Sequence, residues 1–320
     1  MTAIEIRLLF ECYPNQGMKM KKIITLLTVI GLFALIGTPD AKAQNFTAPY
    51  QLFSNSAEAA GFGEAYSTLA NDASAAFWNP AGLAQMESFS FTGVSATALQ
   101  HDRHFSAANV AYHVDGIGTV AFGVTQSGVK DIQRRDDQGM HTGNFDNTNL
   151  VFGLSYARMI TENVSVGITG RFINQDLHVQ VDNGYSADAG VRYDQDLFSV
   201  GVVFQSLVGK VGPDDLPPSF RLGASLRPTG GLITSADLVL DDIGDPNARR
   251  YANFGAGYEV EFNDIILIPR AGLHDGAPAF GGGIGFGLNN MIIRVDYAFV
   301  NEPSDFFGTS HMIGLVIHGL

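Results

Sequence analysis

The sequence is poor in cysteine, tryptophan and positive charge, and each shortage excludes a class of function. Its 320 residues include one cysteine, Cys12, and one tryptophan, Trp78. A single thiol can form no disulfide within the chain, and its place near the N-terminus leaves none elsewhere for thiol catalysis or lipid anchoring. With 19 Lys and Arg against 32 Asp and Glu, the formal net charge is −13, which argues against nucleic acid as a partner.

Long apolar runs are also missing after the first residues of the chain. The apolar stretch Ile23–Ile36 is shorter than the roughly 20 residues that a spanning helix needs. It follows the basic residues of Met18–Lys22 and precedes a small-x-small cleavage sequence. The pattern predicts a secretory signal peptide, residues 1–43, cleaved between Ala43 and Gln44.

From Ser88 onward, Gly, Asn, Asp and Pro interrupt the chain too often for helices, and apolar residues alternate with small or polar ones instead. About fourteen alternating segments follow, most close to the roughly 9–11 residues that a tilted strand needs to cross a membrane. They lie near residues 88–98, 105–113, 118–125, 148–157, 164–175, 185–193, 198–205, 220–227, 232–240, 251–259, 265–274, 279–288, 290–300 and 309–318.

The connections between these segments alternate in length. Short links such as Asp115-Gly116 and Asn289-Asn290 alternate with longer, more polar ones such as Gln126–Asn147 and Ser206–Ser219. Short periplasmic turns and long outer loops are typical of outer-membrane barrels. A soluble β-sandwich or propeller is the alternative, but its outward strand faces would need more charge than the Gly, Ala and Ser found here.

We therefore predict an all-β protein, a transmembrane antiparallel β-barrel of about 14 strands, exported to the bacterial outer membrane and in contact with its lipid. Polar side chains of the minority strand face would then line the lumen. The candidate lumen residues are Arg171, Arg192, Arg221, Arg294 and Asp296.

The segment before the first strand, residues 44–87, is rich in Ala and Ser. Short helices are expected at Ser56–Ala60 and Asn71–Phe77, with Asn71 as the N-cap of the second. Pro80 prevents continuation of that helix, so Asn-Pro-Ala-Gly is expected to form a compact turn directly before the barrel.

The stretch Ser56–Ala84 resembles the N-terminal signature of the PorV/PorQ family of outer-membrane proteins, which belongs with the FadL-like long-chain fatty acid transporters. The shared elements are the Ser-Ala-x-x-Ala-Gly-x-Gly opening, the Asn-Asp-Ala-Ser run Asn71–Ser74 and the Asn-Pro-Ala-Gly-Leu turn Asn79–Leu83.

The resemblance implies a fourteen-stranded barrel, residues 88–320, with residues 44–87 folded inside as a hatch that plugs the lumen. The hatch motif comprises Asn71, Asp72, Trp78, Asn79, Pro80, Ala81 and Gly82. A buried turn at membrane depth needs partners for its backbone, and Asn79 with the lumen arginines could supply them. The alternative is that Asn79–Gly82 is only a tight turn that connects a periplasmic segment to the barrel.

Residues 1–17 precede the basic residues of the signal peptide, so we expect the true start at Met18.

Two functions follow from the resemblance. The first is a type IX protein secretion component that meets secretion-system subunits, or cargo with a C-terminal signal domain, through outer loops such as Gln126–Asn147 with its Arg134–Asp137 charges. The second is passive transport of hydrophobic, fatty-acid-like molecules, with a wall opening where Pro269 kinks a strand.

An enzyme is the least supported function. The sequence has no Gly-x-Ser-x-Gly elbow, His-Glu-x-x-His pair or cysteine–histidine arrangement, and its histidines show no metal-ligand spacing. We expect no catalytic residues, no metal and no cofactor.

Overall fold

The computed structural model describes residues 54–98, 102–177, 180–228, 230–246, 248–301 and 308–319. All of them belong to one compact unit, Ala41–Leu320. The predicted signal peptide and its cleavage site at Ala43 and Gln44 lie outside the described residues, as does the beginning of the predicted hatch.

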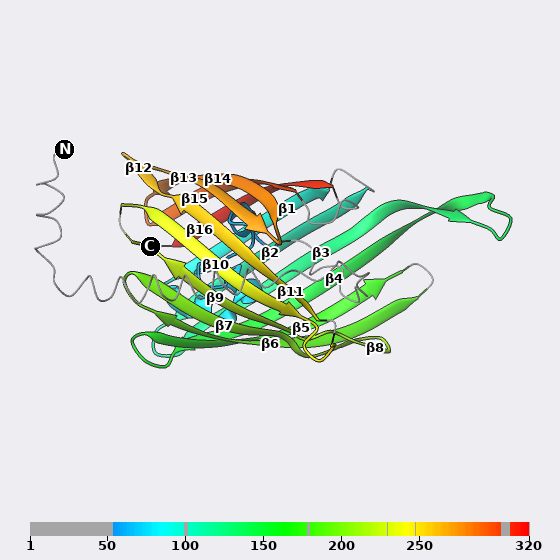
Figure 1. Cartoon of the computed structure of the whole chain (residues 1–320), viewed down its shortest axis with the longest axis horizontal. Helices are drawn as coiled ribbons and strands as arrows, with labels where there is room; N and C mark the ends of the chain where they lie inside the picture. The colour runs from blue at the N-terminus through cyan, green and yellow to red at the C-terminus, as the bar shows by residue number, and fades with distance from the viewer. Residues whose placement is uncertain are drawn as a thin grey trace, which may run out of the picture. The chain divides into compact units, whose positions relative to one another are not determined.

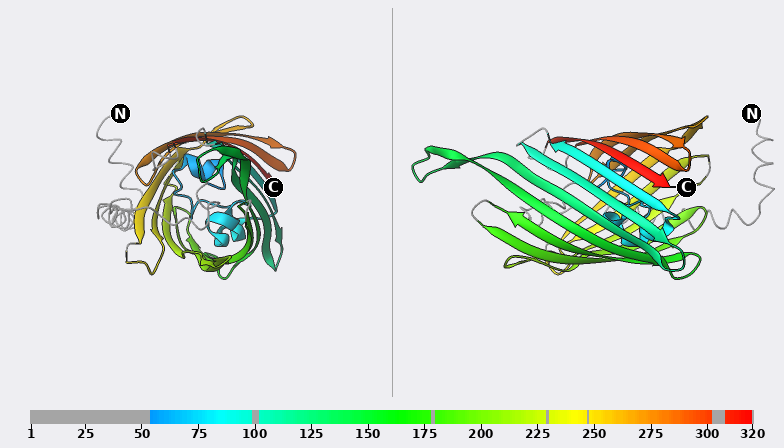
Figure 2. Two further views of the ribbon diagram at one scale, coloured as in Figure 1. Left: turned by 90° about the vertical axis from the view of Figure 1, so that its right-hand side faces the viewer. Right: turned by 180° about the vertical axis from the view of Figure 1, so that it is seen from behind.

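In the described part of the chain, fourteen strands form a closed antiparallel barrel (Figures 1 and 2). Each strand pairs with its sequence neighbours, β1 pairs with β16, and β11 with β13. Two further short strands, β8 (Asp214–Asp215) and β12 (Val260–Phe262), extend the pairing locally. The fourteen are β1 Phe89–Ala98, β2 Arg103–Val114, β3 Gly118–Arg135, β4 His141–Met159, β5 Val164–Asp176, β6 Val181–Asp194, β7 Phe198–Val211, β9 Ser219–Leu226, β10 Leu232–Asp241, β11 Arg249–Tyr258, β13 Ile265–His274, β14 Ala277–Leu288, β15 Met291–Asn301 and β16 Thr309–Gly319.

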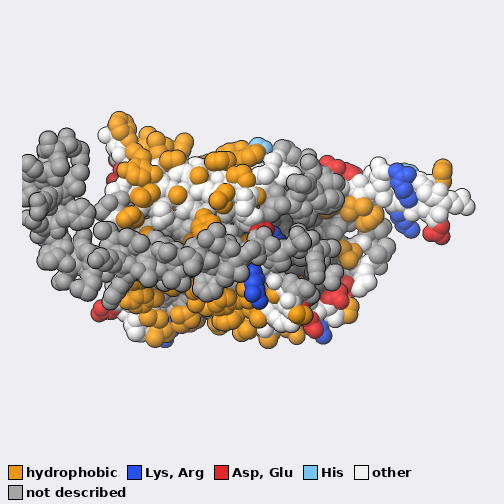
Figure 3. Space-filling model, in the orientation of Figure 1, with side chains coloured by type: hydrophobic (Ala, Val, Ile, Leu, Met, Phe, Trp, Pro, Cys, Tyr) orange, Lys and Arg blue, Asp and Glu red, His pale blue; other side chains and the backbone are white. Residues whose placement is uncertain are grey.

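Alternation along each strand separates an apolar outer face from a small and polar inner face. On β5, Ile168 and Phe172 are 60% and 50% exposed, whereas Thr169 and Arg171 are buried. Apolar side chains accordingly gather over much of the wall in Figure 3, and charged side chains gather at the end where β3 and β4 project. The predicted membrane barrel is confirmed, because only contact with lipid makes such an outer surface favourable.

The prediction of a loop at Gln126–Asn147 is wrong. β3 and β4 run through this stretch as a two-stranded ribbon, and only Asp136–Met140 connects them. Ile132 pairs with Phe145 in the ribbon, which gives this polar stretch an apolar cross-strand contact. The many charged residues of Gln126–Asn147 interrupt the apolar alternation that would otherwise predict strands there.

Pro269 interrupts the sheet without changing its register. β13 pairs with β11 up to Arg270–Gly257 and with β12 from Leu267–Val260 onward. No pairing is present between these two positions, where Pro269 lies. Proline has no N–H to donate to the neighbouring strand, so β11 and β12 are two parts of one interrupted strand.

Residues 54–86, here called the inner segment, lie inside the ring of strands (Figure 2, left). They contain helix α3 (Ala57–Gly61), helix α4 (Ala75–Trp78) and the 3₁₀ helix η2 (Pro80–Gln85). Ser56 caps α3, since its Oγ accepts a hydrogen bond from the Ala59 N–H at 3.3 Å.

The predicted Asn71 cap is wrong. Asn71 is exposed, α4 begins at Ala75, and the carboxylate of Asp72 accepts hydrogen bonds from the N–H and hydroxyl of Ser74 instead. The expected Asn-Pro-Ala-Gly turn is the start of η2, where Pro80 fits because the first turn of a helix needs no donor there. No helix among the described residues is long and apolar enough to cross a membrane.

Candidate functional site

The contact between the inner segment and the barrel wall is the candidate functional site. The wall contributes side chains from nearly every sector of the ring, and the inner segment contributes mostly backbone groups. Because backbone N–H and C=O groups cannot remain unpaired when buried, these contacts determine where the segment lies.

Glu58 on α3 is held by two arginines of the wall. Arg270 donates from Nη2 to Oε1 of Glu58 at 3.1 Å, and Arg294 forms an ion pair with Oε2. Asp296 lies between the two guanidinium groups and accepts from Arg270 Nη1 at 2.6 Å and from Arg294 Nε at 2.8 Å. Two cations and two carboxylates thus form a neutral buried cluster, named here the Glu58 clamp.

Burial raises the pKa of Glu58, but the opposing effect of Arg270 and Arg294 is larger and lowers this pKa to about 2. The nearby Asp72 has no such cation in direct contact. Burial, followed by the charge of Glu58, raises the pKa of Asp72. Glu58 is therefore ionised throughout the physiological pH range.

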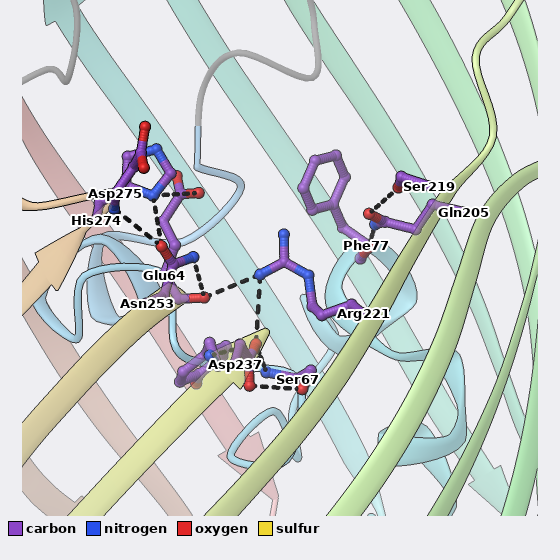
Figure 4. A network of polar contacts seen from close by, with 11 residues as sticks. Glu64, Ser67, Phe77, Gln205, Ser219, Arg221, Asp237, Asn253, His274 and Asp275 are labelled. Atoms are coloured by element: carbon purple, nitrogen blue, oxygen red, sulfur yellow. Dashed lines mark hydrogen bonds and ion pairs between the residues drawn. The ribbon is translucent and has the colours of Figure 1, made fainter. Parts of the chain in front are cut away.

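A second anchor joins β9, β10 and β11 to the middle of the inner segment (Figure 4). The carboxylate of Asp237 accepts from the N–H groups of Tyr66 and Ser67 at 3.2 and 3.1 Å and from the Ser67 hydroxyl at 2.8 Å. Arg221 donates from Nη1 to the Glu64 carbonyl at 3.0 Å and to Asp237 at 3.3 Å. Charge-assisted bonds of this kind are the stronger class of hydrogen bond.

Trp78 lies directly against this anchor. The guanidinium of Arg221 is 5.2 Å from the centre of the Trp78 ring, which is a cation–π distance. Tyr66 and Phe77 meet the same ring edge-on at 5.9 and 5.5 Å between centres. The tryptophan is 1% exposed, so it sits in the centre of the inner segment's aromatic core.

Arginines of β5 and β6 hold the second half of the inner segment. Arg192 donates from Nη1 to the Ala70 carbonyl at 2.7 Å and pairs with Asp194. Arg171 pairs with Asp188 and reaches the Ala76 carbonyl at 3.5 Å. These arginines bridge a wall carboxylate and a carbonyl oxygen of the segment, which satisfies both acceptors.

Asn79 and Pro80 contact the wall backbone so closely that only glycine fits opposite them. An added Cβ at Gly190 would lie 2.1 Å from Oδ1 of Asn79, and one at Gly167 would lie 2.3 Å from the carbonyl carbon of Pro80. These two glycines are paired neighbours on β5 and β6. Together they form a wall surface without side chains that contacts the start of η2, named here the glycine cradle.

The residues predicted from the sequence lie together in this site, with the exception of Asn71. Asp72, Trp78, Asn79, Pro80, Ala81 and Gly82 are buried in the inner segment, whereas Asn71 is exposed. Arg171, Arg192, Arg221, Arg294 and Asp296 all face inward and contact or adjoin the segment. Asn79 supplies a partner to the backbone of the turn, since its Oδ1 accepts from the Ala81 N–H at 3.1 Å. Arg171, Arg192 and Arg221 bind other carbonyl groups of the inner segment.

Several contact residues were absent from the sequence prediction, chiefly Glu58, Asp188, Asp237 and Arg270. Arg270 shares the inward face of its strand with Ile268, and Asp188 shares that of Arg192. Strand alternation could have found these wall residues. Among the described residues, no group of three or more His, Cys, Asp and Glu is arranged to hold a metal ion.

The closed barrel with a polar, occupied interior shares its fold with FadL-like outer-membrane barrels. Solved structures with this fold include the Ralstonia pickettii toluene transporter TbuX, at 14% identity and a TM-score of 0.54, covering 84% of this chain and 98% of that chain. The Pseudomonas putida toluene transporter TodX follows at 12% and 0.53, covering 82% and 96%. A Pseudomonas aeruginosa FadL homologue matches at 12% and 0.52, covering 83% and 98%.

The chain belongs to the PorV family. The family described as type IX secretion system protein PorV matches residues 38–264, which include the inner segment and the wall from β1 to β12. No curated protein sequence matches the chain. Family and fold together indicate a secretion or transport barrel of the outer membrane rather than an enzyme.

Proposed function

We propose that this protein serves type IX secretion as a plugged barrel, and that it works by holding proteins at its outer end rather than by conducting them through its lumen. Membership of the PorV family supports the secretion role. The inner segment supports the closed lumen, because arginine, aspartate and glutamine side chains of the wall bind its backbone from several sides.

The partners proposed are secretion-system subunits and cargo with a C-terminal signal domain. A plugged lumen leaves the outer loops and the β3–β4 ribbon as the surfaces available to such proteins. The ribbon carries exposed charges of both signs, Arg134, Arg135, Asp136 and Asp137, which can pair with complementary charges on another protein.

The test compares cargo at the cell surface in cells with the intact gene, without it, and with a ribbon shortened by joining β3 to β4 near Val129 and Asn147. We expect both altered strains to retain cargo in the periplasm, while the shortened barrel still inserts and shows a heat-dependent gel shift. Normal surface cargo in the deletion strain would contradict the secretion role.

Passive transport of hydrophobic molecules is a second candidate. It is favoured by the likeness in fold to the toluene transporters and by the interrupted pairing at Pro269, which weakens the wall locally. Uptake of toluene by cells with the intact gene, lost on deletion, would support this function.

A further inference from the structure

The ring closes where the first strand pairs with the last. β1 and β16 pair from Ser90–His318 to Ala98–Ser310, and this contact is named here the seam. Every other pair of neighbouring strands in the described ring is joined by a link of the chain, which brings the two strands together. β1 and β16 lie at opposite ends of the barrel sequence, so no such link brings them together.

Alternation of side chains along β1 and β16 does not fix the register of the seam. A slip of one residue would turn outward side chains inward, but a slip of two would leave them outward. Ser95, which pairs with Ile313, would then pair with Leu315. Ile313 and Leu315 are both exposed aliphatic residues of the outer face, so contact with lipid does not distinguish the two registers. Another interaction must select the native register.

Four successive residues of the inner segment, Asn55–Glu58, cross the seam on the lumen side and are named here the seam bridge. Asn55 attaches the bridge to the strands that begin the barrel. Its Nδ2 donates to Thr125 Oγ1 of β3 at 3.0 Å, and its Oδ1 accepts from Asn109 Nδ2 of β2 at 2.8 Å. Asn109 also donates to Thr92 Oγ1 of β1 at 3.2 Å, so this end of the bridge is fixed relative to β1.

Glu58 attaches the other end of the seam bridge to the strands that end the barrel. Its carboxylate binds Arg270 of β13 at 3.1 Å and forms an ion pair with Arg294 of β15. Ala57 passes over β16 beside these contacts, since a Cβ added at Gly314 would lie 3.1 Å from the Ala57 Cβ. Helix α3, which begins at Ala57, accordingly lies against β14, β15 and β16 (Figure 2, left).

The two attachments differ in charge and in the length of chain that they close. Asn55 and its two partners are separated by 54 and 70 residues along the chain, whereas Glu58 and its two arginines are separated by 212 and 236. Closing a shorter loop costs less entropy, so the attachment at Asn55 forms first. On the other side of the seam, the two arginines and Asp296 carry one net positive charge, which Glu58 neutralises.

We propose that the seam bridge directs the closure of the barrel. Asn55 holds the bridge on β2 and β3, and the bridge extends Glu58 past the edge of β1, where the carboxylate binds Arg270 and Arg294 as β13–β16 approach. Since a slip of two residues would move β16 about 7 Å along β1, the ion pairs form only in the native register. The bridge therefore brings the first and last strands together and selects how they pair. The proposal concerns assembly and applies to either candidate function.

Engineered disulfides report the register of the seam, because the single cysteine of the sequence, Cys12, lies in the predicted signal peptide. Ser95→Cys with Ile313→Cys reports the native register, and Ser95→Cys with Leu315→Cys reports a slip of two residues. In the native register the second pair is a diagonal whose Cα atoms lie about 7–8 Å apart, which is too far for a disulfide. In the unaltered background we expect the first pair to be joined and the second to remain free.

The test measures both disulfides in oxidised outer membranes from cells that express each pair. Glu58→Gln should raise the slipped disulfide by about tenfold or more, because the amide no longer pairs with the two arginines and the two registers become similar in energy. The matched control is Asp237→Asn, which also removes a buried carboxylate that joins the inner segment to a wall arginine, but on β10, away from the seam. It should leave the slipped pair rare although it destabilises the barrel. An unaltered register in Glu58→Gln, or equal slippage in both variants, would overturn the proposal.

A time course without replacement of Glu58 keeps the proposal testable if Glu58→Gln does not assemble. Ala57→Cys with Gly314→Cys reports the arrival of the seam bridge at β16, where the two side chains are in contact. During refolding of the mature chain into liposomes, this disulfide should form no later than the disulfide of Ser95→Cys with Ile313→Cys. A seam disulfide that forms first would show that the ring closes without the bridge and that the inner segment enters afterwards, which would overturn the proposal.

Discussion

Asp237 binds Ser67 through two hydrogen bonds at once: its carboxylate accepts from the serine N–H at 3.1 Å and from the serine hydroxyl at 2.8 Å. The aspartate belongs to the barrel wall and the serine to the inner segment. Arg221 pairs with the same carboxylate, so wall and segment share one buried charge cluster. The segment is thereby fixed in orientation as well as in position.

Asp237→Asn should destabilise the folded barrel by on the order of 3 kcal/mol, because it leaves Arg221 buried without its anion. The free energy of unfolding in urea, measured in detergent micelles, checks this expectation. Asp264→Asn makes the same chemical change at an exposed turn residue and should be nearly neutral. Equal stabilities of the two variants would show that the Asp237 anchor contributes nothing.

The glycine cradle predicts a steric effect at Gly167. Gly167→Ala would place a methyl carbon 2.3 Å from the Pro80 carbonyl carbon, so the start of η2 must move, at a cost of about 1–3 kcal/mol. Trp78 is the chain's single tryptophan, and its emission should shift to longer wavelength as water reaches it. Gly170→Ala, on the same strand with nothing within 4 Å of the new carbon, is the matched control and should leave the emission unchanged.

The Glu58 clamp gives a pH dependence whose direction follows from the pKa. Folding lowers the pKa of Glu58 from 4.5 to about 2, so its contribution to stability is complete above 4.5 and is lost as the pH falls toward 2. Attachment of the inner segment to the wall can be measured by its accessibility to protease after refolding into liposomes. The attachment should be constant from pH 8 to pH 5 and should weaken below pH 5. In Glu58→Gln the attachment should be weaker throughout, and this loss with acid should be absent; an identical acid response in both proteins would assign it to another group.

Strand alternation predicted most of the wall, because lipid on one side and the lumen on the other impose opposite chemistry on successive residues. Ile168 and Thr169, adjacent on β5, differ from 60% to 2% in exposure for this reason. The ribbon was missed because both of its faces meet water, so Ile132 and Phe145 stand alone among charged residues and no period appears. Alternation detects strands only where the two faces have different surroundings.

The sequence predicts which wall residues face the lumen, but it does not predict which groups of the inner segment they contact. The inward face of β9 identified Arg221, yet nothing in the sequence indicates that it meets the Glu64 carbonyl and the Trp78 ring. That depends on the path of the inner segment, which is set by its contacts with many strands of the wall. Asn79 illustrates the limit: its burial followed from the motif, but its own Ala81 N–H, rather than an arginine, is its partner.

Asn79→Ala tests whether the inner segment closes the lumen. The substitution removes the side-chain oxygen that caps η2, worth about 1 kcal/mol, and leaves the Ala81 N–H buried without a partner. If the segment is a plug held in part by this cap, liposomes containing the variant should swell faster in small sugars than liposomes with the unaltered protein. Asn71→Ala, at an exposed position of the same segment, should not change the rate. Unaltered swelling in Asn79→Ala, together with an emission shift of Trp78 that proves local loosening, would mean that the motif connects the inner segment to the barrel without sealing it.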